Sequence, residues 1–149
     1  MRYSQGTVGR VFVVRLEDGD ILHECLEQLA RAENVRAASV IVVGGADAGS
    51  RLVVGPQASR ATPVVPVETA LDGVHEIAGT GTIFPDDQGR PQLHLHAACG
   101  RGVGTVTGCV RAGVKTWHVL EAIVTEIRDT PAVRRREETT GFTLLQPLG

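Results

Sequence analysis

The sequence contains few aromatic residues and few cysteines. Aromatic side chains make up 3% of the 149 residues, and there are three cysteines. A hydrophobic core must therefore be filled by aliphatic side chains, and a chain of this length can bury one without disulfide bonds. A small, odd number of cysteines predicts reduced thiols and a cytoplasmic protein.

Long apolar runs are also absent. The longest, Val40 to Val43, is too short to cross a bilayer, and the first six residues lack the apolar region of a secretory signal. We therefore expect neither a membrane segment nor a leader.

Charge of one sign is lacking as well. The formal net charge of −2 gives no electrostatic reason to expect affinity for nucleic acid. The one dense basic run, Arg134 to Arg136, is followed directly by Glu137 and Glu138. We interpret it as a solvated charged loop rather than as a phosphate-binding patch.

Apolar, β-branched runs separated by turn signals occupy most of the chain. One segment, 20–33, has helical periodicity instead, with Asp20 as the expected N-terminal cap and Cys25 within its buried face. An irregular loop is expected over 57–66. Strands are expected at 8–16, 37–43, 51–54, 64–69, 75–83, 92–98, 103–110 and 117–127.

These elements predict an α+β fold in which a largely antiparallel sheet carries one or two packed helices. Residues 1–149 then form a single compact domain, and 128–149 are its C-terminal tail. The expected strand 75–83 is broken by Gly79 and Gly81, and 142–145 is expected to form a short docking strand.

The feature that points to chemistry is the pair His94 and His96. Two residues apart on a strand, both imidazoles lie on one face. A glycine-rich turn over 100–104 would return the chain so that Cys109 lies beside them, whereas Cys99 has the opposite parity. Two imidazoles and a thiolate suit zinc or another divalent transition metal. The alternatives are an ordinary polar strand face and a small buried thiol.

Several segments together resemble the PPC (plants and prokaryotes conserved) domain family. The resemblance is carried by 9–16, 20–32, 37–45, His75-Glu76-Ile77 with Gly79-Thr80, Leu93-His94-Leu95-His96, Val106-Thr107-Gly108-Cys109 and Glu121. Prokaryotic members usually have a His-x-His strand followed by Gly-Gly-His. Here Thr107 replaces the first glycine and Cys109 the last histidine, an exchange that keeps a metal ligand.

The resemblance implies a homotrimer with metal sites near subunit boundaries, and a fold related to that of acetolactate decarboxylase, which holds zinc with three histidines. It also implies a role for Glu121, either in a hydrogen bond to a ligand imidazole or in a salt bridge. His75 and Glu76 are further candidates near the metal, of which at most one can face it because adjacent strand residues point to opposite faces. Surface polarity is the favoured explanation of both. Arg101, in the glycine-rich turn, is a candidate contact for a small anionic ligand or a solvated loop residue.

Three functions follow as hypotheses. The first is a zinc-binding oligomeric module that regulates or senses a ligand. The second is a zinc-dependent lyase or hydrolase acting on a small carbonyl or carboxylate substrate, because three protein ligands leave one zinc position open. The third is DNA binding, which family members are often named for and which the charge of this chain disfavours.

Overall fold

The computed structural model describes residues 1–138 and 140–148. Eight of its ten strands fall where β-branched runs predict them, the other two lie in the C-terminal tail, and every strand pairing is antiparallel. The strands are β1 (Thr7–Glu17), β2 (Ala38–Ala46), β3 (Arg51–Pro56), β4 (Pro66–Ala70), β5 (His75–Pro85), β6 (Pro91–Arg101), β7 (Gly104–Cys109), β8 (Thr116–Arg128), β9 (Val133–Arg136) and β10 (Thr143–Gln146). The helices are α1 (Leu22–Ala32) and the short 3-10 helix η1 (Val110–Ala112).

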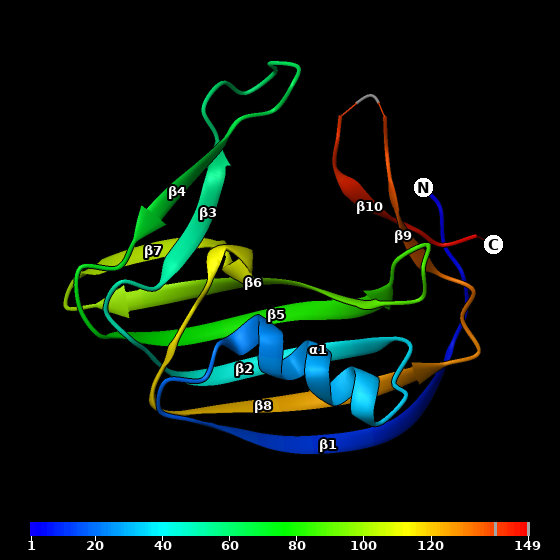
Figure 1. The fold of residues 1–149 in the computed structure, drawn as a ribbon, viewed down its shortest axis with the longest axis horizontal. Coiled ribbons are helices and arrows are strands. Elements are labelled where there is room, and N and C mark those ends of the chain that lie inside the picture. The colour runs from blue at the N-terminus through cyan, green and yellow to red at the C-terminus, as the bar shows by residue number, and fades with distance from the viewer. Residues whose placement is uncertain (139, 149) are drawn as a thin grey trace.

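Eight strands form one sheet in the order β1-β8-β2-β5-β6-β7-β3-β4, and β9 and β10 form a separate hairpin. Helix α1 lies across one face of the large sheet (Figure 1), and its Leu22, Leu26 and Ala30 belong to the same buried aliphatic cluster as the sheet residues. The β3–β4 and β9–β10 hairpins both project from the same side of the molecule (Figure 1). The predicted α+β class and antiparallel sheet are confirmed.

Helix α1 begins later than predicted. Its N-cap is Ile21, which makes no side-chain capping bond, while the carboxylate of Asp20 accepts a hydrogen bond from the N–H of Glu17. The predicted Asp20 cap is therefore wrong, because the tight turn before the helix uses that carboxylate. Cys25 is only partly buried and packs at the edge of the core.

Strand β5 is continuous, so the predicted break at Gly79 and Gly81 is also wrong. A Cβ atom at Gly81 would lie 2.3 Å from the carbonyl oxygen of His94 and 2.6 Å from the Cα of Leu95. These glycines therefore let β5 and β6 approach closely instead of ending the strand.

The predicted turn over 100–104 is shorter than expected. Strand β6 continues to Arg101, and β7 begins at Gly104, so only two residues form the turn. Gly102 supports it with a φ of 58°. This tight hairpin fixes the register between β6 and β7.

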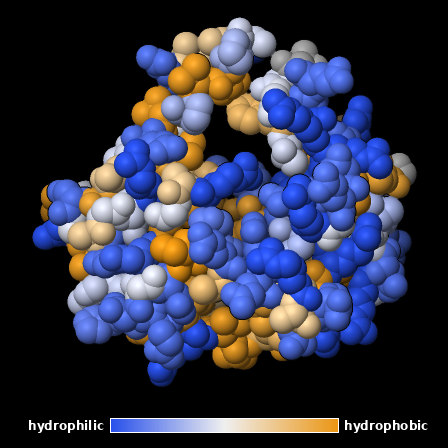
Figure 2. Space-filling model, in the orientation of Figure 1, coloured by the Kyte–Doolittle hydropathy of each residue, from blue (hydrophilic) through white to orange (hydrophobic). Residues whose placement is uncertain are grey.

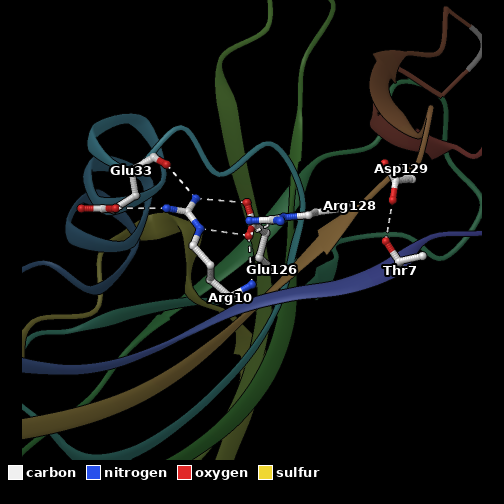
Figure 3. A network of polar contacts seen from close by, with 6 residues as sticks. All are labelled: Thr7, Arg10, Glu33, Glu126, Arg128 and Asp129. Atoms are coloured by element: carbon white, nitrogen blue, oxygen red, sulfur yellow. Dashed lines mark hydrogen bonds and ion pairs between the residues drawn. The ribbon is translucent and has the colours of Figure 1, made fainter.

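A polar network fastens the N-terminal strand to the sheet (Figure 3). The carboxylate of Glu126 accepts hydrogen bonds from the backbone and guanidinium of Arg10 and from Arg128, while Arg10 also reaches Glu33 at the end of α1. These bonds hold the pKa of Glu126 at about 2, with the bond from the Arg10 side chain as the largest cause. The network joins β1, β8 and α1.

Candidate metal centre

His94 and His96 lie near the middle of β6. Their neighbours Leu93, Leu95 and Ala97 are buried on the face that α1 covers, so the alternation of the strand turns both imidazoles to the opposite face. The N–H of Leu93 also donates to the Glu27 carboxylate of α1 at 2.9 Å, which ties this part of β6 to the helix.

The tight β6–β7 hairpin brings the third predicted ligand to the pair. Cys109, the last residue of β7, is the direct cross-strand partner of His96. Cys99 is fully buried on the core face, as its parity predicts. The expected convergence of His94, His96 and Cys109 is what the fold produces.

The donor atoms are close enough to share one ion. One nitrogen or sulfur atom from each of the three residues lies within 4.8 Å of the others, and the two Nε2 atoms of the histidines are 3.1 Å apart. Tetrahedral coordination at zinc distances separates ligand atoms by about 3.3–3.8 Å. The residues present therefore fit a transition metal, and the cluster includes no fourth Asp, Glu, His or Cys from the described part of the chain.

The environment of His94 disfavours its protonated form. Removal from water by the surrounding protein lowers the pKa of His94 to about 4, and the positive charges of Arg134, His96 and Arg111 add to the effect. An unprotonated imidazole is the form that binds a metal ion.

A pocket of about 780 Å³ opens above the three residues. Its lining surface is mostly apolar, and the β3–β4 hairpin and the β10 segment supply seven of its apolar residues. Figure 2 shows the hollow between the two hairpins. The lining includes Val53, Val54, Pro56, Val64, Pro66, Thr107, Arg111, Ala112, Phe142 and Leu144. A pocket of this size and polarity is typical of small-molecule sites.

The structure does not bring the other predicted site residues to the cluster. Glu121 lies on the same sheet face but on β8, three strands from β6, or about 14 Å away. Glu76 shares that face too, yet it lies four residues along β5 from Thr80, the partner of His96, which is about 13 Å.

Arg101 and His75 differ from their sequence interpretations in another way. Arg101 closes β6 beside the turn, about 17 Å along the strand from His96, and lies 3.7 Å from the Asp72 carboxylate. His75 is buried rather than exposed. Its Nδ1 lies 2.9 Å from the carbonyl oxygen of Gly73, so the buried ring has a hydrogen-bond partner. Surface polarity therefore explains Glu76 but not His75.

Two arginines near the cluster were missed in the sequence. Arg111 follows Cys109 by two residues and lines the pocket from η1. Residues 134–136 belong to strand β9, so their interpretation as a loop is wrong, and Arg134 is 3% exposed, so it is not solvated either. Its Nη2 donates to Thr82, the cross-strand partner of His94. Proximity to Cys109 was a signal for Arg111, whereas Arg134 stood out only as part of the basic run 134–136, and nothing in the sequence connected it with His94.

A family model provides the decisive comparison. The model of the Plants and Prokaryotes Conserved domain, abbreviated PCC or PPC, matches residues 3–128. The chain belongs to this family. No curated protein matches the sequence significantly.

Solved structures of PPC-like proteins share the fold. A metal-containing protein from Archaeoglobus fulgidus is 21% identical with a TM-score of 0.84, and the match covers 98% of this chain and 99% of the Archaeoglobus chain. A PPC protein from Pyrococcus horikoshii is 19% identical with a TM-score of 0.81, covering 100% and 99%. A protein from Ralstonia eutropha, whose name suggests DNA binding, is 22% identical with a TM-score of 0.69, covering 90% and 89%.

Proposed function

We propose that this PPC domain protein is a zinc-binding homotrimer that senses a small ligand in a regulatory role. The observation that carries the proposal is the convergence of His94, His96 and Cys109 at the base of a mostly apolar pocket. Two imidazoles and a thiolate are a donor set for zinc or a neighbouring transition metal, and not for magnesium or calcium. The Archaeoglobus fulgidus protein of the same fold is described as metal-containing.

Ligand binding is favoured over catalysis by the surroundings of the cluster. A bound zinc ion with three protein ligands would offer one position to a ligand or a water molecule. Glu68 is the acidic residue in the pocket lining, and its carboxylate is held 2.9 Å from Arg51. No carboxylate of the described lining is therefore free to move protons, which a metal-assisted lyase or hydrolase would need.

The trimer is supported by the sheet face that carries the cluster. Along one cross-strand row, Val13, Ile123 and Ile41 lie side by side on β1, β8 and β2, and the row continues through Thr80 to His96. Val13 is 83% exposed and Ile41 is 59% exposed. A contiguous apolar face of this kind is typical of a protein interface, and the family resemblance is the reason for proposing three copies.

The test of the metal is elemental analysis of the purified protein. We expect close to one zinc ion per chain, and we expect Cys109→Ala and His96→Ala to lose most of it. Cys99→Ala is the matched control, because that thiol is buried on the other face of the sheet and should leave the zinc content unchanged. Protein that binds no divalent transition metal even after addition of zinc would contradict the proposal.

The second candidate is the zinc-dependent lyase or hydrolase, which the open pocket and incomplete ligand set favour. Metal-dependent turnover of a small carbonyl or ester compound, lost in Cys109→Ala, would establish it. The relation to acetolactate decarboxylase stays a prediction.

DNA binding is a third candidate function, because two proteins of the same fold carry names that suggest it. The net charge of −2 speaks against it, and retention on DNA that falls with rising salt would be needed to restore it. No described helix has the length and apolar character to cross a membrane. A cytoplasmic location rests on the unpaired thiols and is part of the proposal.

A further inference from the structure

The pocket above the metal centre combines apolar walls with uncompensated positive charge. Its lining surface is mostly apolar, and eight of its lining residues are valine, proline, alanine, phenylalanine or leucine. Its charged lining residues are Glu68 and Arg111, besides the titratable His94, His96 and Cys109. Since Glu68 is already paired with Arg51, the positive charge of Arg111 stands without a local carboxylate.

The end of β7 determines where Arg111 lies. Strand β7 ends at Cys109, and the turn of η1 that follows places Arg111 in the pocket wall two residues after the third candidate ligand. The described residues supply no ion pair to its guanidinium. Arg111 is exposed and lines the pocket, so a ligand can reach it.

Arg134 does not line the main pocket, but it places a second guanidinium near His94, in a small cavity that adjoins the pocket. One of its nitrogens donates to Thr82 at 2.9 Å, and Thr82 lies directly beside His94 across the β5–β6 pair. Its Nε is buried without a hydrogen-bond partner among the described residues. The guanidinium also lies 5.9 Å from the centre of the Phe84 ring.

Nearby acidic groups do not neutralise Arg134. A small cavity that it lines adjoins the main pocket at Thr143, and Asp86 and Asp87 are the acids there. The carboxylate of Asp86 is bound by Arg90 at 2.8 Å, and no described carboxylate lies within 4.0 Å of the Arg134 guanidinium. A buried cation with an unpartnered N–H is costly unless an anion accompanies it.

We propose that Arg111 and Arg134, together with the metal centre, form a binding site for a small carboxylate that carries an apolar body. The carboxylate would lie between the arginines and the metal, since guanidinium groups and zinc both bind carboxylate oxygens. The apolar body would lie against the valines and prolines of the β3–β4 hairpin and against Phe142 and Leu144. This inference rests on the proposed ligand-sensing function and names the class of its ligand.

The apolar walls distinguish this class from inorganic anions. Phosphate or sulfate would use the arginines but would leave the apolar wall in contact with water. A short aliphatic acid uses both parts of the pocket, and a volume of about 780 Å³ is ample for a chain of several carbons. The binding of a neutral analogue and of inorganic phosphate therefore tests the two halves of the proposal separately.

The experiment is calorimetric titration of the zinc-loaded protein with hexanoate, hexanamide and inorganic phosphate. We expect hexanoate to bind about tenfold more tightly than hexanamide, because a neutral amide cannot form the charged hydrogen bonds. Arg111→Gln should weaken hexanoate binding about tenfold, and Arg134→Lys, which keeps the charge but not the planar fork, should weaken it to a smaller extent. Arg101→Gln is the matched control and should change nothing, since Arg101 lies at the far end of β6.

Elemental analysis and circular dichroism of each variant separate the possible failures. Zinc-loaded, folded protein that binds hexanoate no more tightly than hexanamide would overturn the carboxylate site while leaving the metal centre intact. Phosphate binding as tight as that of hexanoate would overturn the role of the apolar wall. Hexanoate binding that depends on Arg111 in a protein that takes up no metal would preserve the arginine site and refute the zinc proposal. If Arg134→Lys does not fold, the Arg111→Gln variant and the comparison of hexanoate with hexanamide and phosphate still decide whether the carboxylate site exists.

Discussion

Gly108, the neighbour of Cys109 on β7, gives the sharpest test of how the fold builds the metal centre. A Cβ atom at this position would lie 2.5 Å from the carbonyl oxygen of Val53 and 3.2 Å from the Cβ of Leu52, both on β3. The first contact involves backbone, so no side-chain rotation can relieve it. Gly108→Ala must therefore push β3 away from β7.

The size of the effect follows from how β3 is attached. Strand β3 joins β7 through a single registered pair, Val53 with Cys109, so the hairpin has few bonds with which to resist displacement. Overpacking of this kind typically costs about 1–3 kcal/mol of stability. Because the displaced strand is also a wall of the pocket, we expect Gly108→Ala to weaken zinc binding about tenfold or more.

Urea denaturation at a fixed protein concentration measures the first effect, and competition with a zinc chelator measures the second. Gly100→Ala is the matched control on the paired strand. A Cβ there meets nothing nearer than 3.8 Å, so stability and zinc affinity should stay close to those of the unmutated protein. If Gly108→Ala is as stable and binds zinc as tightly as Gly100→Ala, the account of the β3–β7 contact is refuted.

Two further predictions concern stability and assembly. Glu126→Gln should cost roughly 1–2 kcal/mol above pH 5, because it removes a carboxylate that accepts bonds from Arg10 and Arg128. The pKa of Glu126 is lowered from an ordinary 4.5 to about 2, so its contribution to stability is complete above about pH 4.5 and disappears as the pH falls toward 2. Denaturation curves of the unmutated protein and of Glu126→Gln should therefore converge in acid. A constant difference in stability across that pH range would contradict the assignment. Ile41→Glu should raise the dissociation constant of the trimer at least about a hundredfold, since it places a charge in the proposed interface, and light scattering should show the loss of mass. Val103→Glu, at the fully exposed β6–β7 turn, should leave the mass unchanged, and an unaltered mass for Ile41→Glu would exclude this face as the interface.

Much of the sheet could be predicted because its local signals are strong. The run 8–16 and the run 117–127 are rich in β-branched residues, and the structure pairs them as β1 and β8. The glycines of β5 misled the prediction because a strand interior rarely carries two of them. Their reason lies in a neighbouring strand, which the sequence around them does not reveal.

The three candidate ligands could also be placed by sequence. Parity alone puts His94 and His96 on one face, and a return strand of the opposite direction brings Cys109 to them. The sequence did not determine the length of the turn between the two strands, and hence which residue faces Cys109. The tight hairpin at Gly102 made His96 the direct cross-strand partner of Cys109.

What the sequence by itself determined is thus local: the strand identities, the alternation of faces and the order of the ligand residues along the chain. The tertiary structure alone decided which distant residues surround the ligands. It placed Glu121, Glu76 and Arg101 away from the cluster. Strand order puts Glu121 three strands from β6, while Glu76 and Arg101 lie several residues along their strands from the level of the ligands. It brought Arg134 to Thr82, the cross-strand partner of His94, through the β9–β10 hairpin. This contact spans 52 residues of chain, depends on how the tail folds back over the sheet, and leaves no periodic trace in the sequence.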